Sequence, residues 1–288
     1  MQQSRTDLAV EAAAAFGPNP PSGIQVERME EEGVEVTRVT VHTPQAARRL
    51  GRAPGHYVTV ELPAISQPVD PAGTATRLVA RELTGLLPRR GMVLVAGLGN
   101  QQITPDALGP LTCRQILVTR HIPAQLACQT GLTGLRPVAA LAPGVLGQTG
   151  MEAWEVLQWV IRELRPAAVV AVDALAAQSL DRLGTTVQLC DSGISPGSGV
   201  LNARRELSQQ TLGIPVVAVG IPTVVDGATL ARELSGRDCR EGSPACTMMV
   251  TPREIDAIVT RGAKCLSLAI NQALQPRLSP EELQFLVS

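Results

Sequence analysis

The stretch Ala167-Ala168-Val169-Val170-Ala171-Val172-Asp173 places six aliphatic residues directly before a carboxylate. An aliphatic run without polar alternation is typical of a strand that is buried on both faces, as in a parallel sheet covered by helices. Similar runs recur at 92–96, 137–141, 185–189 and 214–219, and helical periodicity separates most of them. The pattern predicts an α/β protein, a three-layer α/β/α sandwich around a mainly parallel sheet.

Around this core, helices are expected at 75–87, 107–119, 152–164, 202–211, 227–236, 252–274 and 280–287. Before it, β-like runs at 24–28, 34–42 and 57–62 predict a small N-terminal antiparallel β unit. Residues 17–23 contain three prolines and two glycines, which break both helices and strands. We therefore expect the first 16 residues to form a tail set apart from the folded body.

The composition excludes several classes of protein. Lys and Arg total 25 against 26 Asp and Glu, so no basic excess is available to bind nucleic acid. The apolar stretches are far shorter than the roughly 18 residues of a membrane span, and the first 16 residues lack a basic patch followed by an apolar run, so a cytoplasmic protein is predicted. The six cysteines are scattered without a C-x-x-C pair, which argues against a zinc site or a disulfide framework.

Ligands of a parallel sheet bind beyond the carboxyl ends of its strands, and 97–110 is the first such segment. Its G-x-G start resembles a dinucleotide fingerprint, but Gln102 stands where the third glycine is needed. A second interpretation is the start of a helix, with Thr104 as N-cap, Pro105 at the first helical position and Asp106 interacting favourably with the helix dipole.

Asp173 ends the aliphatic strand that opens this section. Burying an unpaired carboxylate is costly, so it either caps backbone groups, holds a proton or faces a cleft. Asp106 is also expected beyond a parallel strand. Two close carboxyls do not both ionise readily, so one would hold a proton as an acid while the other activates water, which is the chemistry of amide hydrolysis by an aspartic-type mechanism.

The glycine-rich loop 191–199 follows another strand, and its residues 193–197 match the G-x-S-x-G pattern around Ser195. An α/β-hydrolase needs its histidine after the serine, whereas all three histidines precede Ser195. The order Asp106, His121, Ser195 stays open, because triads are defined by geometry. In the last such segment, 220–227, Asp226 is more typical of a helix N-cap than of a catalytic group.

Taken together, several ordered blocks resemble the spore germination protease family, over nearly the whole chain. The blocks are 5–12, 97–110, 136–138 with 143–145, 172–177, 191–199 and 213–226. The resemblance implies a fold related to the hydrogenase maturation proteases. It implies a cytoplasmic endopeptidase of the forespore or spore core, typically homotetrameric, which is made as a zymogen and degrades small acid-soluble spore proteins during germination.

The resemblance also implies site residues. The two proposed catalytic aspartates fall on Asp106 and Asp173. The loop residues that we take as candidates for substrate binding are Asn100, Asp191, Ser192, Gly193, Gly197 and Gly199. The related maturation proteases hold a metal through a histidine that has no match here, so neither metal nor cofactor is predicted, nor is a nucleic-acid or membrane partner. Familiar members also carry a long helical insertion after the Asp226 segment, which this chain lacks.

The tail sequence Thr6-Asp7-Leu8-Ala9-Val10-Glu11 resembles the acidic-aliphatic sequence that this family cuts in its substrates. We therefore expect self-cleavage between Asp7 and Leu8, with 1–7 as propeptide and 8–288 as a single catalytic domain. The alternative is a short amphipathic helix at 9–16. Two other functions stay open: a serine hydrolase that uses Ser195, and a non-catalytic α/β module that binds a small ligand or metal.

Overall fold

The computed structural model describes residues 6–63, 73–129, 133–197, 204–236, 243 and 248–287. Its strands are β1 (Ile24–Glu31), β2 (Val34–Val41), β3 (Gly55–Glu61), β4 (Val93–Gly97), β5 (Val138–Leu141), β6 (Ala168–Ala177), β7 (Thr186–Cys190), β8 (Val216–Asp226) and β9 (Met249–Val250). Its longer helices are α3 (Thr74–Leu86), α7 (Ala153–Leu164), α9 (Gly227–Ser235), α10 (Ile255–Leu274) and α11 (Pro280–Val287). Shorter ones are α1 (Ala9–Ala14), α2 (Pro44–Leu50), α4 (Leu108–Cys113), α5 (Ala124–Gln129), α6 (Leu146–Thr149) and α8 (Gln209–Leu212), with 3-10 turns η1 (Thr104–Asp106) and η2 (Leu180–Arg182).

The described strands form one sheet in the order β1-β2-β3-β7-β8-β6-β4-β5, with β9 beside β8. The four strands β5, β4, β6 and β8 run parallel, which confirms the parallel core. The N-terminal strands pair antiparallel, as predicted, but they are no separate unit, because β3 pairs antiparallel with β7 and thereby extends the same sheet.

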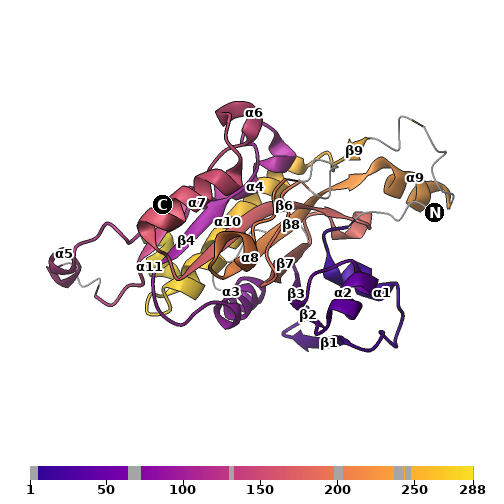
Figure 1. The fold of residues 1–288 in the computed structure, drawn as a ribbon, viewed down its shortest axis with the longest axis horizontal. Helices are drawn as coiled ribbons and strands as arrows, with labels where there is room; N and C mark the ends of the chain where they lie inside the picture. Colours follow the sequence, from indigo (N-terminus) through magenta and orange to yellow (C-terminus); the bar gives the residue numbers. More distant parts are fainter. Residues whose placement is uncertain are drawn as a thin grey trace.

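Helices cover both faces of this sheet, which confirms the layered α/β architecture (Figure 1). On one face, α3, α4 and α10 pack over alternate residues of the central strands, such as Val170 and Val172 of β6. On the other face, α7 and α8 pack over Val169 and Ala171. Because neighbouring residues of β6 point to opposite faces, Asp173 belongs to the α7 face.

Two strands are longer than the sequence predicts. β6 continues past Asp173 to Ala177, and β8 continues past Val219 to Asp226, because the two strands keep pairing through a bulge at Leu175. Asp173 therefore lies inside a strand rather than after its end. Other helices are shorter than predicted: α4 ends at Cys113, and of the expected helix at 202–211 the described residues form only α8.

The N-terminal segment is not set apart from the folded body. Leu8 and Ala9 are completely buried, and α1 packs with α2 against the antiparallel strands (Figure 1). The helix that the alternative interpretation placed at 9–16 is thus present at Ala9–Ala14. Its apolar side chains complete two clusters of the core.

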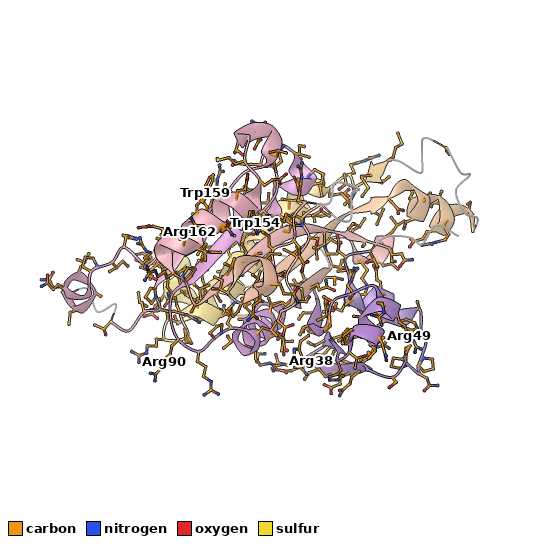
Figure 2. All side chains as sticks on the ribbon, in the orientation of Figure 1. Arg38, Arg49, Arg90, Trp154, Trp159 and Arg162 are labelled. Atoms are coloured by element: carbon orange, nitrogen blue, oxygen red, sulfur yellow. The ribbon has the colours of Figure 1, made fainter. Side chains whose placement is uncertain are left out.

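Side-chain contacts tie the antiparallel strands to the helical layer. Arg38 of β2, which is labelled in Figure 2, makes two hydrogen bonds to Glu82 of α3, at 2.7 and 3.0 Å. Asp226 caps α9 by accepting the Thr229 N–H at 2.6 Å, as the sequence predicts. Within the described part of the chain, no helix is long and apolar enough to cross a membrane.

Candidate active site

A cavity of ≈ 770 Å³ lies beyond β4 and against the extended halves of β6 and β8. Asp106 and Asp173 both line it, so the structure brings together the two carboxyls that the sequence singles out. Of the other predicted site residues, the cavity wall includes Asn100, Ser192, Gly193 and Gly197. Gly199 lies outside the described residues.

Asp173 is positioned by β6, and only 5% of its surface is exposed. One carboxyl oxygen accepts the N–H of Ala174 at 2.9 Å. Burial raises the pKa of Asp173 well above its usual range, and the negative charges of Asp106 and Asp7 raise it further, against the opposing effect of the Ala174 N–H. Asp173 therefore holds a proton at a pH where an exposed aspartate has lost it.

Asp106 ends the 3-10 turn that follows β4. Its carboxylate accepts the Asn100 N–H at 2.7 Å, and the Thr223 hydroxyl fixes the turn to β8 by donating to the Pro105 carbonyl at 2.8 Å. Half-burial raises the pKa of Asp106, and the Asn100 N–H opposes that rise. Thr104 is not the N-cap expected from the sequence, because it is the first residue of the turn and Ile103 precedes it.

The two carboxyls differ in environment, which separates their roles. Asp173 is the more deeply buried and feels the charge of Asp106, so the shared proton belongs on Asp173. Asp106 accepts a backbone N–H, which favours its ionised form. One protonated and one ionised carboxyl in a cavity can act as general acid and general base on the same bound molecule.

The glycine-rich loop contributes residues 192–197, and no carboxylate, to the cavity wall. Asp191, expected near the substrate, does not line the cavity. It accepts the His56 N–H at 2.7 Å and pairs with the His56 ring at 2.8 Å. Ser192 faces the cavity, where its hydroxyl donates to the Tyr57 hydroxyl at 2.9 Å.

The residues of the possible serine triad, Asp106, His121 and Ser195, do not come together in the structure. Ser195 and Asp106 line the cavity, but His121 does not. The backbone N–H groups of Thr119 and Arg120 both donate to the Val138 carbonyl, at the amino end of β5. His121 therefore lies at the end of the parallel strands opposite to the cavity.

The N-terminal segment borders the cavity. The Asp7 N–H donates to the Ala176 carbonyl at 2.8 Å, and the Ala176 N–H donates back to the Asp7 carboxylate at 2.9 Å. Further along, the Gln178 N–H donates to Glu11 at 2.8 Å. The guanidinium of Arg52 donates to the Thr6 carbonyl. Residues 6–11 therefore lie along the end of β6, next to Asp173.

Sequence reasoning missed the basic and aromatic part of the wall. Arg205 stacks over the Trp154 ring at 3.4 Å, and both line the cavity together with Arg52 and Arg204. Figure 2 shows Trp154 and Trp159 along the same helix, α7. No spacing signal links these residues, because they come from a helix and from loops far apart in the chain. Among the described residues, no group of three His, Cys, Asp or Glu side chains is arranged to hold a metal ion.

Comparison with known proteins agrees with this picture. A family model for germination protease matches residues 7–235. The germination protease of Caldanaerobacter subterraneus subsp. tengcongensis is 37% identical over 317 aligned positions, with 98% of each chain covered. That of Clostridium acetobutylicum is 36% identical with the same coverage, and one from Bacillus cereus is 41% identical over 83% of this chain and 70% of its own. The alignment with the first is longer than the 288 residues of this chain, so that relative contains segments that this chain lacks.

Among solved structures, a [NiFe] hydrogenase maturation protease, HycI from Thermococcus kodakarensis, is similar to 66% of this chain and 98% of its own, at 17% identity and a TM-score of 0.38. The fold and cavity described above define an α/β protein with its site beyond the parallel strands. The chain belongs to the germination protease family, which confirms the resemblance seen in the sequence and makes it a peptidase.

Proposed function

We propose that this protein is an endopeptidase that begins the degradation of small acid-soluble spore proteins in the spore cytoplasm, with Asp106 and Asp173 as its catalytic pair. Its family membership supports peptidase activity. The observation that carries the mechanism is that the two carboxyls line one cavity and that the charge of Asp106 acts on the buried Asp173. Incubating the purified protein with a spore-protein substrate and identifying the fragments by mass spectrometry tests the activity. Substrate that stays intact with the mature chain beginning at Leu8 would refute it.

The two aspartates divide the hydrolysis of a peptide bond between them. Ionised Asp106 takes a proton from water while the water oxygen bonds to the carbonyl carbon, and the carbonyl electron pair moves onto its oxygen. Protonated Asp173 gives its proton to the leaving nitrogen. The C–N bond then breaks, the carbonyl re-forms, and an acid and an amine leave. Neither step needs a covalent intermediate on the protein.

We propose that the first substrate is the chain itself, cut between Asp7 and Leu8, with 1–7 as propeptide. The supporting observation is that residues 6–11 lie along β6, where Asp7 also borders the cavity. Full-length protein is expected to yield a mature chain that begins at Leu8, and the Asp106→Asn protein is expected to stay unprocessed. N-terminal sequencing measures both. An active enzyme that retains Met1 or Gln2, or an Asp106→Asn protein that matures on its own, would contradict self-cleavage.

Ser195 is expected to be dispensable. His121 does not line the cavity beside Ser195, so no triad activates this serine, and Ser195→Ala should keep most of the proteolytic activity, the lost hydroxyl costing at most one substrate hydrogen bond. Initial rates of peptide cleavage measure this, with Ser235→Ala, outside the cavity, as the control. A loss on the order of 10³-fold or more would instead favour the serine mechanism.

We further propose that the active form is a homotetramer, as the family resemblance implies. Size-exclusion chromatography with light scattering would test this, since the monomer mass is 30.3 kDa. A single monomeric species at assay concentration would contradict it.

A further inference from the structure

Gln188 is a buried polar side chain that the mechanism above does not use. It lies on β7 with only 6% of its surface exposed, and it lines the cavity. Gln188 pairs with Gly220 of β8, and Gly220 pairs with Asp173 of β6, so the three residues form one row across three neighbouring strands. Two strand spacings, roughly 10 Å, separate the backbones of Gln188 and Asp173.

Gln188 and Asp173 point to the same face of the sheet. Their sequence neighbours Val187 and Val172 pack with α3 and α10 on the opposite face. Gly220, between them, has no side chain. A Cβ there would lie 2.5 Å from the Asp173 carbonyl oxygen and 2.7 Å from the Leu175 side chain, so no larger residue fits. The row therefore carries an amide on one side and a carboxyl on the other, and of the side chains that of Leu175 lies closest to the position above Gly220.

The Gln188 amide contacts the backbone of the N-terminal segment on both sides of Leu8. Its Nε2 donates to the Asp7 carbonyl at 2.6 Å, and its Oε1 accepts the Ala9 N–H at 2.5 Å. The orientation of the amide is dictated by its partners, because a carbonyl only accepts and a backbone N–H only donates. The Asp7 carbonyl belongs to the peptide bond between Asp7 and Leu8. Leu8 itself is completely buried, so this bond is fixed in place.

We infer that Gln188 is a further catalytic residue, whose Nε2–H binds the carbonyl oxygen of the peptide bond being cut and stabilises the oxyanion that forms on it. The inference rests on the proposed cleavage between Asp7 and Leu8. When water adds to the Asp7 carbonyl carbon, the carbonyl electron pair moves onto the oxygen that Gln188 already contacts. When the bond to the Leu8 nitrogen breaks, that pair returns and the carbonyl re-forms. A donor aimed at this oxygen before the reaction needs no reorganisation during it.

The same contacts define what a substrate must offer. Gln188 binds a carbonyl and, two residues later, an N–H, which sets the direction of an extended peptide in the cavity. The residue between them fills an apolar pocket, which Leu8 occupies beside Leu175, Leu183 and Val225. The substrate class is thus an unfolded segment with an aliphatic residue directly after the cut.

The test compares full-length chains that carry Gln188→Met or Gln188→Glu with the wild type. Met removes both hydrogen bonds at similar volume. Glu keeps an acceptor for Ala9 and preserves the shape if Met impairs folding. It loses the donor only where it is ionised, so its cleavage rate is measured at the alkaline end of the active pH range. The control is Gln275→Met, because Gln275 is also buried and makes the same two-bond contact to the Arg136 backbone, at the opposite end of the sheet. Self-cleavage of the docked segment is a first-order process, followed by the appearance of chains beginning at Leu8.

Both Gln188 variants are expected to cut themselves about 10²-fold more slowly than the wild type, as loss of one oxyanion donor does, while Gln275→Met stays near the wild-type rate. Hydrogen exchange of residues 10–14, whose amides do not contact Gln188, should change less than about threefold on adding Gln188→Met in the uncut Asp106→Asn background, a mark of lost catalysis rather than lost docking. Cleavage within threefold of wild type, or a loss of protection as large as the loss of rate, would overturn the role of Gln188 and leave the aspartate pair standing. A wild type that never cuts after Asp7 would overturn the cleavage proposal and this inference together.

Discussion

Asp173→Asn and Asp106→Asn are each expected to abolish proteolysis, with a loss of about 10³-fold or more in the rate of peptide cleavage. The mechanism needs one carboxyl with a proton and one without, and a neutral amide can serve as neither base nor acid. Asp226→Asn is the matched control, because Asp226 lies outside the cavity wall and Asn caps a helix as well as Asp does. Near wild-type turnover in either cavity variant would remove that residue from the mechanism.

The same Asp173→Asn change is expected to stabilise the protein at neutral pH. Burial raises the pKa of Asp173 in the folded state above the ordinary value of 3.8. Above pH 3.8 the unfolded chain therefore loses a proton that the folded chain retains, and folding stability falls as the pH rises from 3.8 through the folded-state pKa. Asparagine has no proton to lose, so the Asp173→Asn protein does not show this fall in stability.

Thermal melting at pH 4, 5.5 and 7 measures the stability effect. The Tm of Asp173→Asn should exceed that of the wild type only slightly at pH 4, and the difference should grow towards pH 7. In a chain of this size, each kcal/mol in the free energy of unfolding corresponds to about 2–4 °C in Tm. Circular dichroism at 25 °C shows whether the variant has the wild-type fold. A Tm difference that does not change with pH would mean that Asp173 is not buried with a raised pKa.

Gly109→Ala is expected to cause the largest loss of stability, about 3 kcal/mol, with activity falling in parallel. Gly109 lies in α4 against the end of β4 and the middle of β6. A Cβ there would lie 2.2 Å from the Leu98 carbonyl oxygen and 2.4 Å from that of Val172, which are backbone atoms that cannot move aside separately. Any shift displaces the two segments that carry Asp106 and Asp173.

Calorimetric melting measures this prediction, with Gly85→Ala as control. Gly85 lies in α3 with open space where the methyl would go, so its replacement should raise stability slightly, by about 0.5–1 kcal/mol. A Gly109→Ala protein as stable as the wild type would show that α4 does not pack against β4 and β6 as described.

Much of the fold follows from local pattern. Long aliphatic runs and 3.6-residue periodicity are strong signals, and they predict β4, α3, α7 and the start of β6 to within about two residues. The second half of β6 was missed because Asp173 interrupts the apolar run. Its pairing with β8 is a tertiary effect that outweighs the local signal.

The site could be predicted in part for the same reason. Asp106 and Asp173 stand next to strands, so their meeting follows from parallel topology. Nothing in the local sequence predicts a role for Gln188, because a glutamine in a strand is an ordinary polar residue. Its place in the cavity follows only from the pairing of β7 with β8. The docking of residues 8–14 was also missed, since the proline-rich stretch 17–23 predicts a break in secondary structure and says nothing of packing.

The order of the sheet leaves β1 and β5 as its two edges in the described part of the chain. β1 has three glutamates and an arginine among its eight residues, and β5 has only four residues. Charged and short edges resist pairing with the strands of another molecule. A continuous intermolecular sheet between copies of this protein is therefore disfavoured at both of these edges.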